Sequence, residues 1–193
     1  VGGKLLRQRV HTHDGVELAV VVGGDLDAHR TALCIPGALG TAETDFAPQL
    51  AGGLGAGVRV VAFDPRGYGA SRPPERTFPV PPDAHESFYH IDARDALAVA
   101  DAVCGPSSRF SVLGWSDGAN VACVLAGGDA RARVESLVIW GGNAYVTDED
   151  MANWEAVRDV RTAWSERMRS SLGAVYGGDD GLQALNGRFT DAM

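Results

Sequence analysis

The stretch Phe110-Ser111-Val112-Leu113-Gly114-Trp115-Ser116-Asp117-Gly118 decides the fold of this 193-residue chain. A short apolar run typical of a buried strand leads into the pattern Gly-x-Ser-x-Gly, and a helix is expected over Asp117–Ala126. Gly114 and Gly118 leave room for a sharp turn between strand and helix, which strains the Ser116 backbone and exposes its hydroxyl. The pattern therefore predicts a nucleophile at Ser116, with the Asp117 N–H beside it as a donor to an oxyanion.

Apolar runs alternate with helical stretches on both sides of this motif. Two strands are expected first, Leu5–Val10 and Val16–Val22, around a His13-Asp14-Gly15 turn; a transit peptide is the weaker alternative for this segment. The later expected strands lack polar alternation, as parallel strands covered on both faces do. They are Thr31–Ile35, Val58–Asp64, Phe110–Gly114 and Val134–Gly141, with further helices near Thr44–Ala51 and Glu86–Cys104. This order predicts an α/β fold with a mostly parallel, doubly wound sheet and an antiparallel start.

The pattern changes after Gly142. Thr147 with Asp150 three positions later matches a capping box, and apolar residues then recur at helical spacing as far as Gly173. The stripe comprises Met151, Trp154, Val157, Val160, Trp164, Met168 and Leu172. It predicts one long amphipathic helix that packs on the domain below or lines a substrate pocket, followed by a shorter helix over Gly181–Phe189. We therefore expect a core over residues 1–142 and an incomplete helical lid over residues 143–193.

Composition narrows the classes of protein. A net charge of −8, without any basic block, makes nucleic acid a poor partner. The longest apolar runs are too short to span a bilayer, so no membrane partner is expected. The cysteines are odd in number and form no Cys-x-x-Cys pattern, and no Asn-x-Ser/Thr sequence occurs. We therefore expect Cys34, Cys104 and Cys123 to be reduced residues of the core. For the protein we expect an intracellular, reducing compartment.

A second loop supports the nucleophile motif. Pro36-Gly37-Ala38-Leu39-Gly40 directly follows the strand that ends at Ile35. Serine hydrolases built on such a sheet place their other oxyanion donor in this loop. By general reasoning on such loops, either Ala38 or Leu39 could supply the N–H.

Several motifs in register resemble the biphenyl-hydrolase-like family of α/β-hydrolases, which includes valacyclovir hydrolase, and the likeness covers essentially the whole chain. They are Pro36–Gly40 with Glu43–Phe46, Asp64-Pro65-Arg66-Gly67-Tyr68-Gly69, Gly114–Gly118, Ile139–Gly141 and Asn143–Asp150. The resemblance implies a serine hydrolase that cleaves small-molecule esters of α-amino acids, with no metal or cofactor, and a mitochondrial location. It implies that Ser116 is the nucleophile and that Leu39 and Asp117 are the oxyanion donors. The Asp117 carboxylate would also hold the substrate's amino group.

The catalytic base is missing from this pattern. In this fold the acid and then the histidine follow the serine along the chain, whereas all five histidines precede Ser116. His85 and His90, at the end of the proline-rich Ser71–Ser87 surface loop, are weak substitutes. We therefore expect an inactive fragment of a hydrolase, with Leu137–Trp140 as an exposed edge strand. The alternatives are an intact, non-catalytic binding protein with this fold, or another chemistry of the fold such as a lyase.

Overall fold

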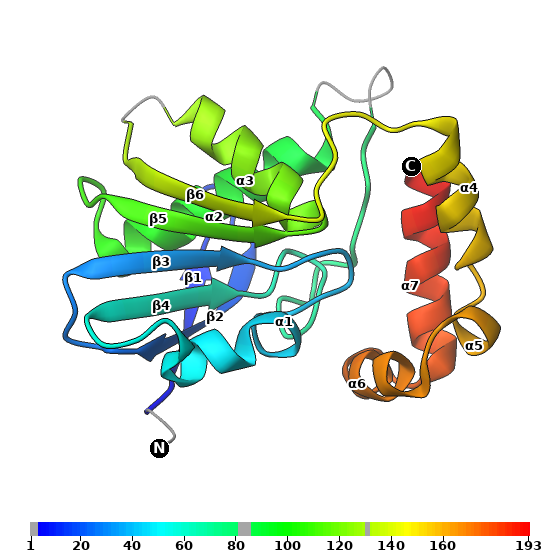
Figure 1. The fold of residues 1–193 in the computed structure, drawn as a ribbon, viewed down its shortest axis with the longest axis horizontal. Coiled ribbons are helices and arrows are strands. Elements are labelled where there is room, and N and C mark those ends of the chain that lie inside the picture. Colours follow the sequence, from blue (N-terminus) through cyan, green and yellow to red (C-terminus); the bar gives the residue numbers. More distant parts are fainter. Residues whose placement is uncertain (1–3, 81–85, 130–131) are drawn as a thin grey trace.

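The computed structural model describes residues 4–80, 86–129 and 132–193. Its centre is a six-stranded sheet in the order β1-β2-β4-β3-β5-β6 (Figure 1). The strands are β1 (Leu6–His11), β2 (Glu17–Gly24), β3 (Arg30–Ile35), β4 (Val58–Phe63), β5 (Phe110–Trp115) and β6 (Val134–Trp140). Strand β2 runs antiparallel to both β1 and β4, and the remaining pairs are parallel. The predicted mostly parallel sheet with an antiparallel start is confirmed.

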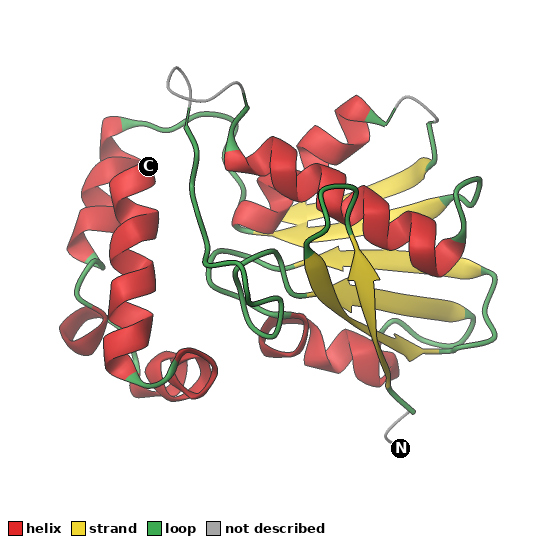
Figure 2. Ribbon diagram, turned by 180° about the vertical axis from the view of Figure 1, so that it is seen from behind, coloured by secondary structure: helices red, strands yellow, loops and turns green. Residues whose placement is uncertain are grey.

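Helices cover both faces of the sheet (Figure 2). On one face, α2 (Phe88–Cys104) and α3 (Asp117–Gly128) bury Val99, Val121 and Leu125 against Leu33 and Val61. On the other face, α1 (Ala42–Pro48) and the π-helical turn η1 (Gln49–Gly53) bury Ala42, Phe46 and Leu50 against Cys34 and Ala62. Successive residues of a strand point to opposite faces, so an almost wholly apolar strand fills both layers at once.

The strand order reverses beside β3, and this reversal places the functional loops. The chain leaves β3 for β4 on one side, whereas the later strand β5 pairs with the other side of β3. The loops that follow β3 and β5 therefore start at the ends of neighbouring strands and lead away in different directions. Open α/β sheets bind their ligands at such a topological switch point, at the carboxyl ends of the strands.

The prediction of one long C-terminal helix is wrong. The segment forms α4 (Asp148–Ala156), α5 (Val160–Ala163), α6 (Glu166–Tyr176) and α7 (Asp179–Ala192), which lie together beyond the carboxyl ends of the strands (Figure 1). The capping box of Thr147 and Asp150 is confirmed.

Side-chain caps end the expected long helix twice. Asp159 accepts a hydrogen bond from the Arg161 N–H, and Ser165 accepts one from the Met168 N–H, so each starts a new helix. The Asn186 side chain on α7 donates to the carbonyls that the first break leaves free, those of Val157 and Arg158. Apolar periodicity ignores such caps, because a capping residue can stand between two positions of the stripe without changing its spacing.

Two expectations about buried residues need correction. The described part of the proline-rich segment is not simply a surface loop, because the Arg76 guanidinium is buried and makes two hydrogen bonds to Asp92, 2.8 and 2.7 Å long. The aromatic rings of Tyr68, Phe78 and Phe88 surround this guanidinium.

The cysteines are free, as expected, but only Cys34 is fully buried in the core. Burial raises the pKa of its thiol to about 12. Cys104 is half-buried and Cys123 is exposed, so the expectation of core cysteines is wrong for Cys123.

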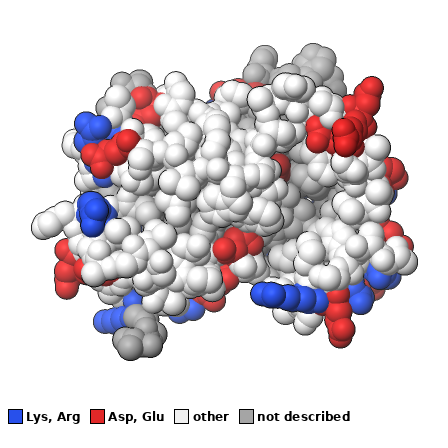
Figure 3. Space-filling model, viewed as in Figure 1, with Lys and Arg blue, Asp and Glu red and all other residues white. Residues whose placement is uncertain are grey.

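The outer strand β6 is exposed, as expected for Leu137–Trp140. These residues are 37–52% exposed, and because they alternate between faces, the described residues cover each face of β6 only in part. Figure 3 shows a surface largely without charged side chains over β5 and β6. No helix in the described residues has both the length and the apolar character that crossing a membrane requires.

Gly118 on α3 fixes how closely that helix approaches the sheet. A Cβ atom there would overlap the Ile35 carbonyl oxygen and would lie 2.5 Å from the Pro36 oxygen. We expect Gly118→Ala to lower the free energy of unfolding by about 1–3 kcal/mol, because the helix must move away from the main chain. In a chain of this size each 1 kcal/mol lowers the melting midpoint by about 2–4 °C, which circular dichroism measures.

The matched control is Gly127→Ala on the same helix, where a Cβ atom would meet no atom within 4 Å. This variant should keep or slightly raise the midpoint, because alanine favours helix over glycine by about 1 kcal/mol. Equal midpoints for the two variants would contradict the close-packing argument.

Candidate functional site

Ser116 lies at the turn between β5 and α3, where the sequence predicts a nucleophile. Its φ of 54° and ψ of −128° are strained for a residue with a side chain, and such strain costs on the order of 1–3 kcal/mol. The Ser116 N–H donates to the Trp140 carbonyl at 2.9 Å, so the pairing of β5 with β6 continues up to the serine. A Cβ atom on Gly114 would overlap the Gly118 carbonyl oxygen, so glycine is required below the turn.

The loop after β3 lies against this turn. A Cβ atom on Gly37 would come within 3.1 Å of the Ser116 Cβ. The Gly40 N–H donates to the Gly37 carbonyl at 3.1 Å, which closes a four-residue turn. Leu39, the third residue of that turn, has a φ of 62°. A positive φ at the third position alone is the type II pattern, which normally has glycine or asparagine there.

The structure therefore brings the predicted donors Leu39 and Asp117 to the same end of the sheet as Ser116. The Asp117 N–H belongs to the first turn of α3, where a helix supplies no acceptor. The roles of Leu39 and Asp117 as oxyanion donors stay predictions.

Asp45 connects the two loops, and sequence reasoning missed its part. Its carboxylate accepts hydrogen bonds from the Trp115 indole at 2.7 Å and from the Gly37 N–H at 3.0 Å. A side chain on Gly40 would overlap this carboxylate. Burial raises the pKa of Asp45, and the two donors oppose that shift. Asp45 belongs to the Glu43–Phe46 motif, but no spacing rule connects its position on α1 to Trp115.

Asp117 carries the most perturbed carboxylate beside Ser116. Burial raises its pKa to about 6, while the hydrogen bond from Tyr89 and the charge of Arg76 act in the opposite direction. The Tyr89 hydroxyl donates to the Asp117 carboxylate at 3.1 Å from α2. Arg76 comes from the proline-rich segment and Tyr89 from α2, so two other parts of the chain influence the ionisation of Asp117 on α3. Neither Tyr89 nor Arg76 was singled out in the sequence.

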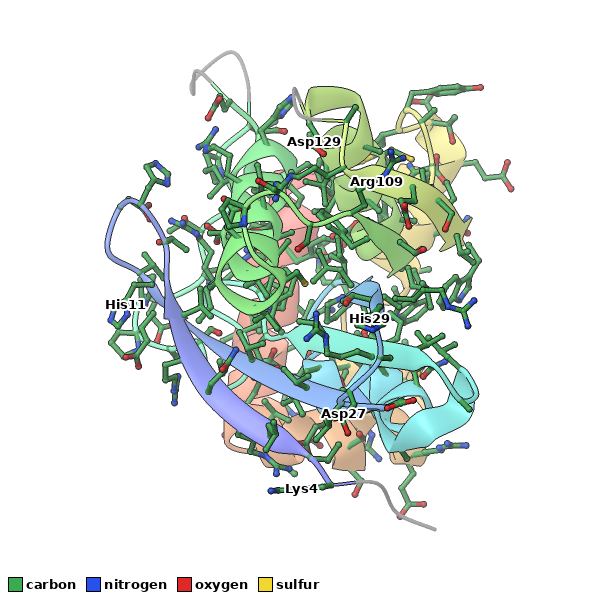
Figure 4. The ribbon with its side chains drawn as sticks, turned by 90° about the vertical axis from the view of Figure 1, so that its left-hand side faces the viewer. Lys4, His11, Asp27, His29, Arg109 and Asp129 are labelled. Atoms are coloured by element: carbon green, nitrogen blue, oxygen red, sulfur yellow. The ribbon has the colours of Figure 1, made fainter. Side chains whose placement is uncertain are left out.

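No histidine among the described residues reaches the Ser116 hydroxyl. His29 precedes β3 and lies at the opposite end of the sheet, whereas His11 ends β1, four strands from β5, which is about 19 Å at the usual strand spacing (Figure 4). His13 is exposed in the turn after β1. His90 is exposed, and its ring nitrogen is 2.8 Å from the Ser87 hydroxyl. His85 lies outside the described residues.

Two hollows near the sheet contain neither Ser116 nor Leu39. One, of about 480 Å³, lies between α3 and the segment after β6, and Tyr89, Asn120 and Tyr145 line it. The other, of about 720 Å³, lies beside β1, β2 and α1. The first of these adjoins Asp117 through Tyr89. It is bounded on one side by Ile139 of the edge strand β6.

The Tyr89 contact gives a direct test of the electrostatics at Asp117. We expect Tyr89→Phe to raise the Asp117 pKa above about 6, because the variant removes a hydrogen bond that stabilises the ionised carboxylate. Carboxyl carbon chemical shifts followed by NMR between pH 3 and pH 9 measure this pKa. Tyr145→Phe is the matched control, since Tyr145 is 75% exposed. An unchanged pKa in Tyr89→Phe would show that the hydroxyl does not contribute.

Known proteins share this architecture and much of this sequence. Residues 32–192 match the Alpha/beta hydrolase family. The chain is 44% identical over 166 residues to Serine hydrolase BPHL of Homo sapiens, covering 86% of this chain and 53% of the human protein. It is 42% identical over 153 residues to Serine hydrolase BPHL of Mus musculus, covering 79% of this chain and 49% of the mouse protein.

These relatives confirm the resemblance to the biphenyl-hydrolase-like proteins, and the chain spans about half the length of the curated relatives it matches. In structure it resembles a hydrolase from Pseudomonas aeruginosa PA01, with a TM-score of 0.67 at 23% identity, over 96% of this chain and 72% of that one. The sheet order, the turn at Ser116 and the match over residues 32–192 agree: this chain belongs to the alpha/beta hydrolase family.

Proposed function

We propose that Ser116 is the nucleophile of a serine hydrolase that cleaves carboxylic esters of α-amino acids. The observation that carries the proposal is the strained serine at the carboxyl end of β5, packed against a loop whose Leu39 is also held at positive φ. Two strained residues at one end of a sheet cost stability, and such strain concentrates at functional sites.

The chemistry follows from this geometry. The Ser116 oxygen would attack the ester carbonyl carbon, and its proton would pass to a general base, which then protonates the departing alcohol. The N–H groups of Leu39 and Asp117 would donate to the oxyanion that forms. Removal of one such donor in other enzymes lowers kcat by about 100- to 1000-fold. Water then cleaves the acyl-serine ester and releases the free acid.

The base is proposed to come from residues outside this 193-residue chain. Each histidine among the described residues is either exposed or distant from Ser116. The open strand β6, with Ile139 and Trp140 each 44% exposed, would accept a further strand of the sheet. Without a base a serine hydroxyl is a weak nucleophile, so we propose that the chain alone is inactive.

The helical segment from α4 to α7 is proposed to be part of a lid. Leu182, Leu185 and Phe189 of α7 and Tyr176 of α6 pack in one buried cluster with Leu39 and Tyr68. These buried contacts lie on the side of the helices that faces the core domain. On other sides the helices are exposed, as Met151 at 39% and Met168 at 47% exposure show. A mitochondrial location, which the resemblance to the biphenyl-hydrolase-like family implies, is a further part of the proposal.

Asp117 supports the choice of an amino-acyl substrate. A carboxylate directly beside the nucleophile opposes the negative charge that develops on the oxyanion. An α-ammonium group on the substrate would remove that conflict by pairing with Asp117. A charge-assisted hydrogen bond of this kind is worth about 1.5–3 kcal/mol.

Activity of the 193-residue chain tests where the base lies. We expect its kcat on a simple ester to be at least about 1000-fold below that of the whole protein, because loss of the histidine base lowers kcat by about 10⁶-fold in a serine protease. Circular dichroism must first show that the chain is folded. Turnover within about tenfold of the whole protein, abolished by Ser116→Ala, would show that the chain contains its own base.

The selectivity of Asp117 is tested in the whole protein with two esters that differ only in the α-amino group. Asp117→Asn should lower the ratio of kcat/KM for the amino ester over the neutral ester by about tenfold or more. In the wild type this ratio should fall as the pH drops through about 6, because the carboxylate becomes protonated, and the variant should lose that dependence.

Asp148→Asn is the control, since it removes the same charge from an exposed position in the first turn of α4. Equal losses on the two esters in Asp117→Asn would contradict recognition of the ammonium group.

A further inference from the structure

Leu39 occupies a backbone conformation that its own side chain disfavours. Its φ of 62° lies in the left-handed region that favours glycine. Leu39 nevertheless carries a large side chain, and the residue is only 1% exposed. The type I turn that leucine prefers differs from the observed type II turn mainly by a half rotation of the central peptide group. That group joins Ala38 to Leu39 and carries the Leu39 N–H. A relaxed turn would therefore point this N–H away from its present direction.

One hydroxyl from the C-terminal helices contacts the strained residue directly. The Tyr176 hydroxyl, at the end of α6, donates to the Leu39 carbonyl at 2.7 Å. The same oxygen accepts a hydrogen bond from the Gly69 N–H at 3.4 Å. Tyr176 thus connects the loop after β3 with the loop after β4, and it does so from a residue 137 positions away from Leu39 in the sequence.

Tyr176 is itself held in place by Arg72. The Arg72 guanidinium lies 5.0 Å from the centre of the Tyr176 ring and donates to the Val175 carbonyl at 2.8 Å. Its Nε donates to the Gly69 carbonyl, also at 2.8 Å. Burial raises the pKa of the Tyr176 hydroxyl, so the group keeps the proton that it donates. The ring of Tyr68 packs edge-on at 6.5 Å and completes the surroundings.

We propose that Tyr176 is a positioning residue, whose hydroxyl holds the Leu39 turn in the orientation that directs the Leu39 N–H toward the oxyanion. The inference rests on the proposed role of Leu39 as an oxyanion donor. The carbonyl that Tyr176 binds belongs to the peptide group after Leu39, so the bond fixes the position of the loop after β3. It makes the C-terminal helices part of the catalytic geometry rather than only a cover, because α6 supplies this hydrogen bond. Tyr176 itself touches no reacting atom in this proposal.

The test is Tyr176→Phe in the whole protein, with Tyr145→Phe as the matched loss of an exposed hydroxyl. Phenylalanine keeps the ring under Arg72, so the variant should fold and melt close to the wild type. We expect kcat on an ester substrate to fall by about 10- to 100-fold while KM stays within about threefold, because donation to the oxyanion matters in the transition state. Affinity for a boronic acid that bonds to the serine should fall with kcat, whereas affinity for the product acid should not.

Titration of active sites separates positioning from folding. If kcat per active site stays within twofold of the wild type while hydrolysis depends on Ser116, the inference is overturned. The same holds if only the number of active sites falls. Hydrolysis that survives Ser116→Ala would instead overturn the proposed function, and the inference with it. Amide hydrogen exchange gives a readout that does not depend on activity: the Leu39 N–H should exchange at least about tenfold faster in Tyr176→Phe, and an unchanged rate would contradict the positioning role.

Discussion

The arrangement depends on the absence of side chains where α3 meets the sheet. Gly118 lets the first turn of the helix rest on the carbonyl oxygens of Ile35 and Pro36, and Gly114 lets β5 pass beneath the Gly118 carbonyl. Main chain packs on main chain at this point, so the end of β3 and the start of α3 cannot shift independently. The position of Ser116 depends on this contact, because the serine stands between the two glycines.

Buried carboxylates hold the loops that the glycines bring together. Asp45 accepts hydrogen bonds from the loop after β3 and from Trp115, and Asp64 accepts them from the Ala42 and Ala70 N–H groups. Burial raises the pKa of both acids, and the bonds they accept favour their charged forms. Loops fastened by buried carboxyl groups in an apolar setting have few alternative conformations, because any rearrangement would leave a buried polar group without its hydrogen-bond partners.

Much of the fold could be predicted because it depends on local patterns. Apolar runs marked the strands, and Gly-x-Ser-x-Gly after Phe110–Leu113 marked the turn at Ser116. The breaks at Asp159 and Ser165 could not be predicted from periodicity, since capping is a competition between side chain and main chain that leaves the apolar spacing intact. The predicted site residues met at one end of the sheet because strand order alone decides which loops are neighbours.

The supporting residues could not be predicted in the same way. Asp45 reaches Trp115 across 70 positions, and Tyr89 reaches Asp117 from a different helix. Such pairs leave no spacing signal in a single sequence, because their proximity arises only from the tertiary packing of α1, α2 and α3. The sharp turn at Ser116 can be predicted from the residues next to it in the sequence. The ionisation of Asp117, in contrast, depends on groups that come together only in the folded chain.

The different burial of the three cysteines also has a practical consequence. Cys123 is exposed on α3, whereas Cys34 lies within the sheet and burial strongly suppresses its thiolate. An alkylating reagent should therefore modify the native protein first at Cys123, and modification of Cys34 should require the central strands to separate. With Cys123 and the half-buried Cys104 both replaced, the rate at which Cys34 becomes labelled would report how often the sheet opens, without any added probe.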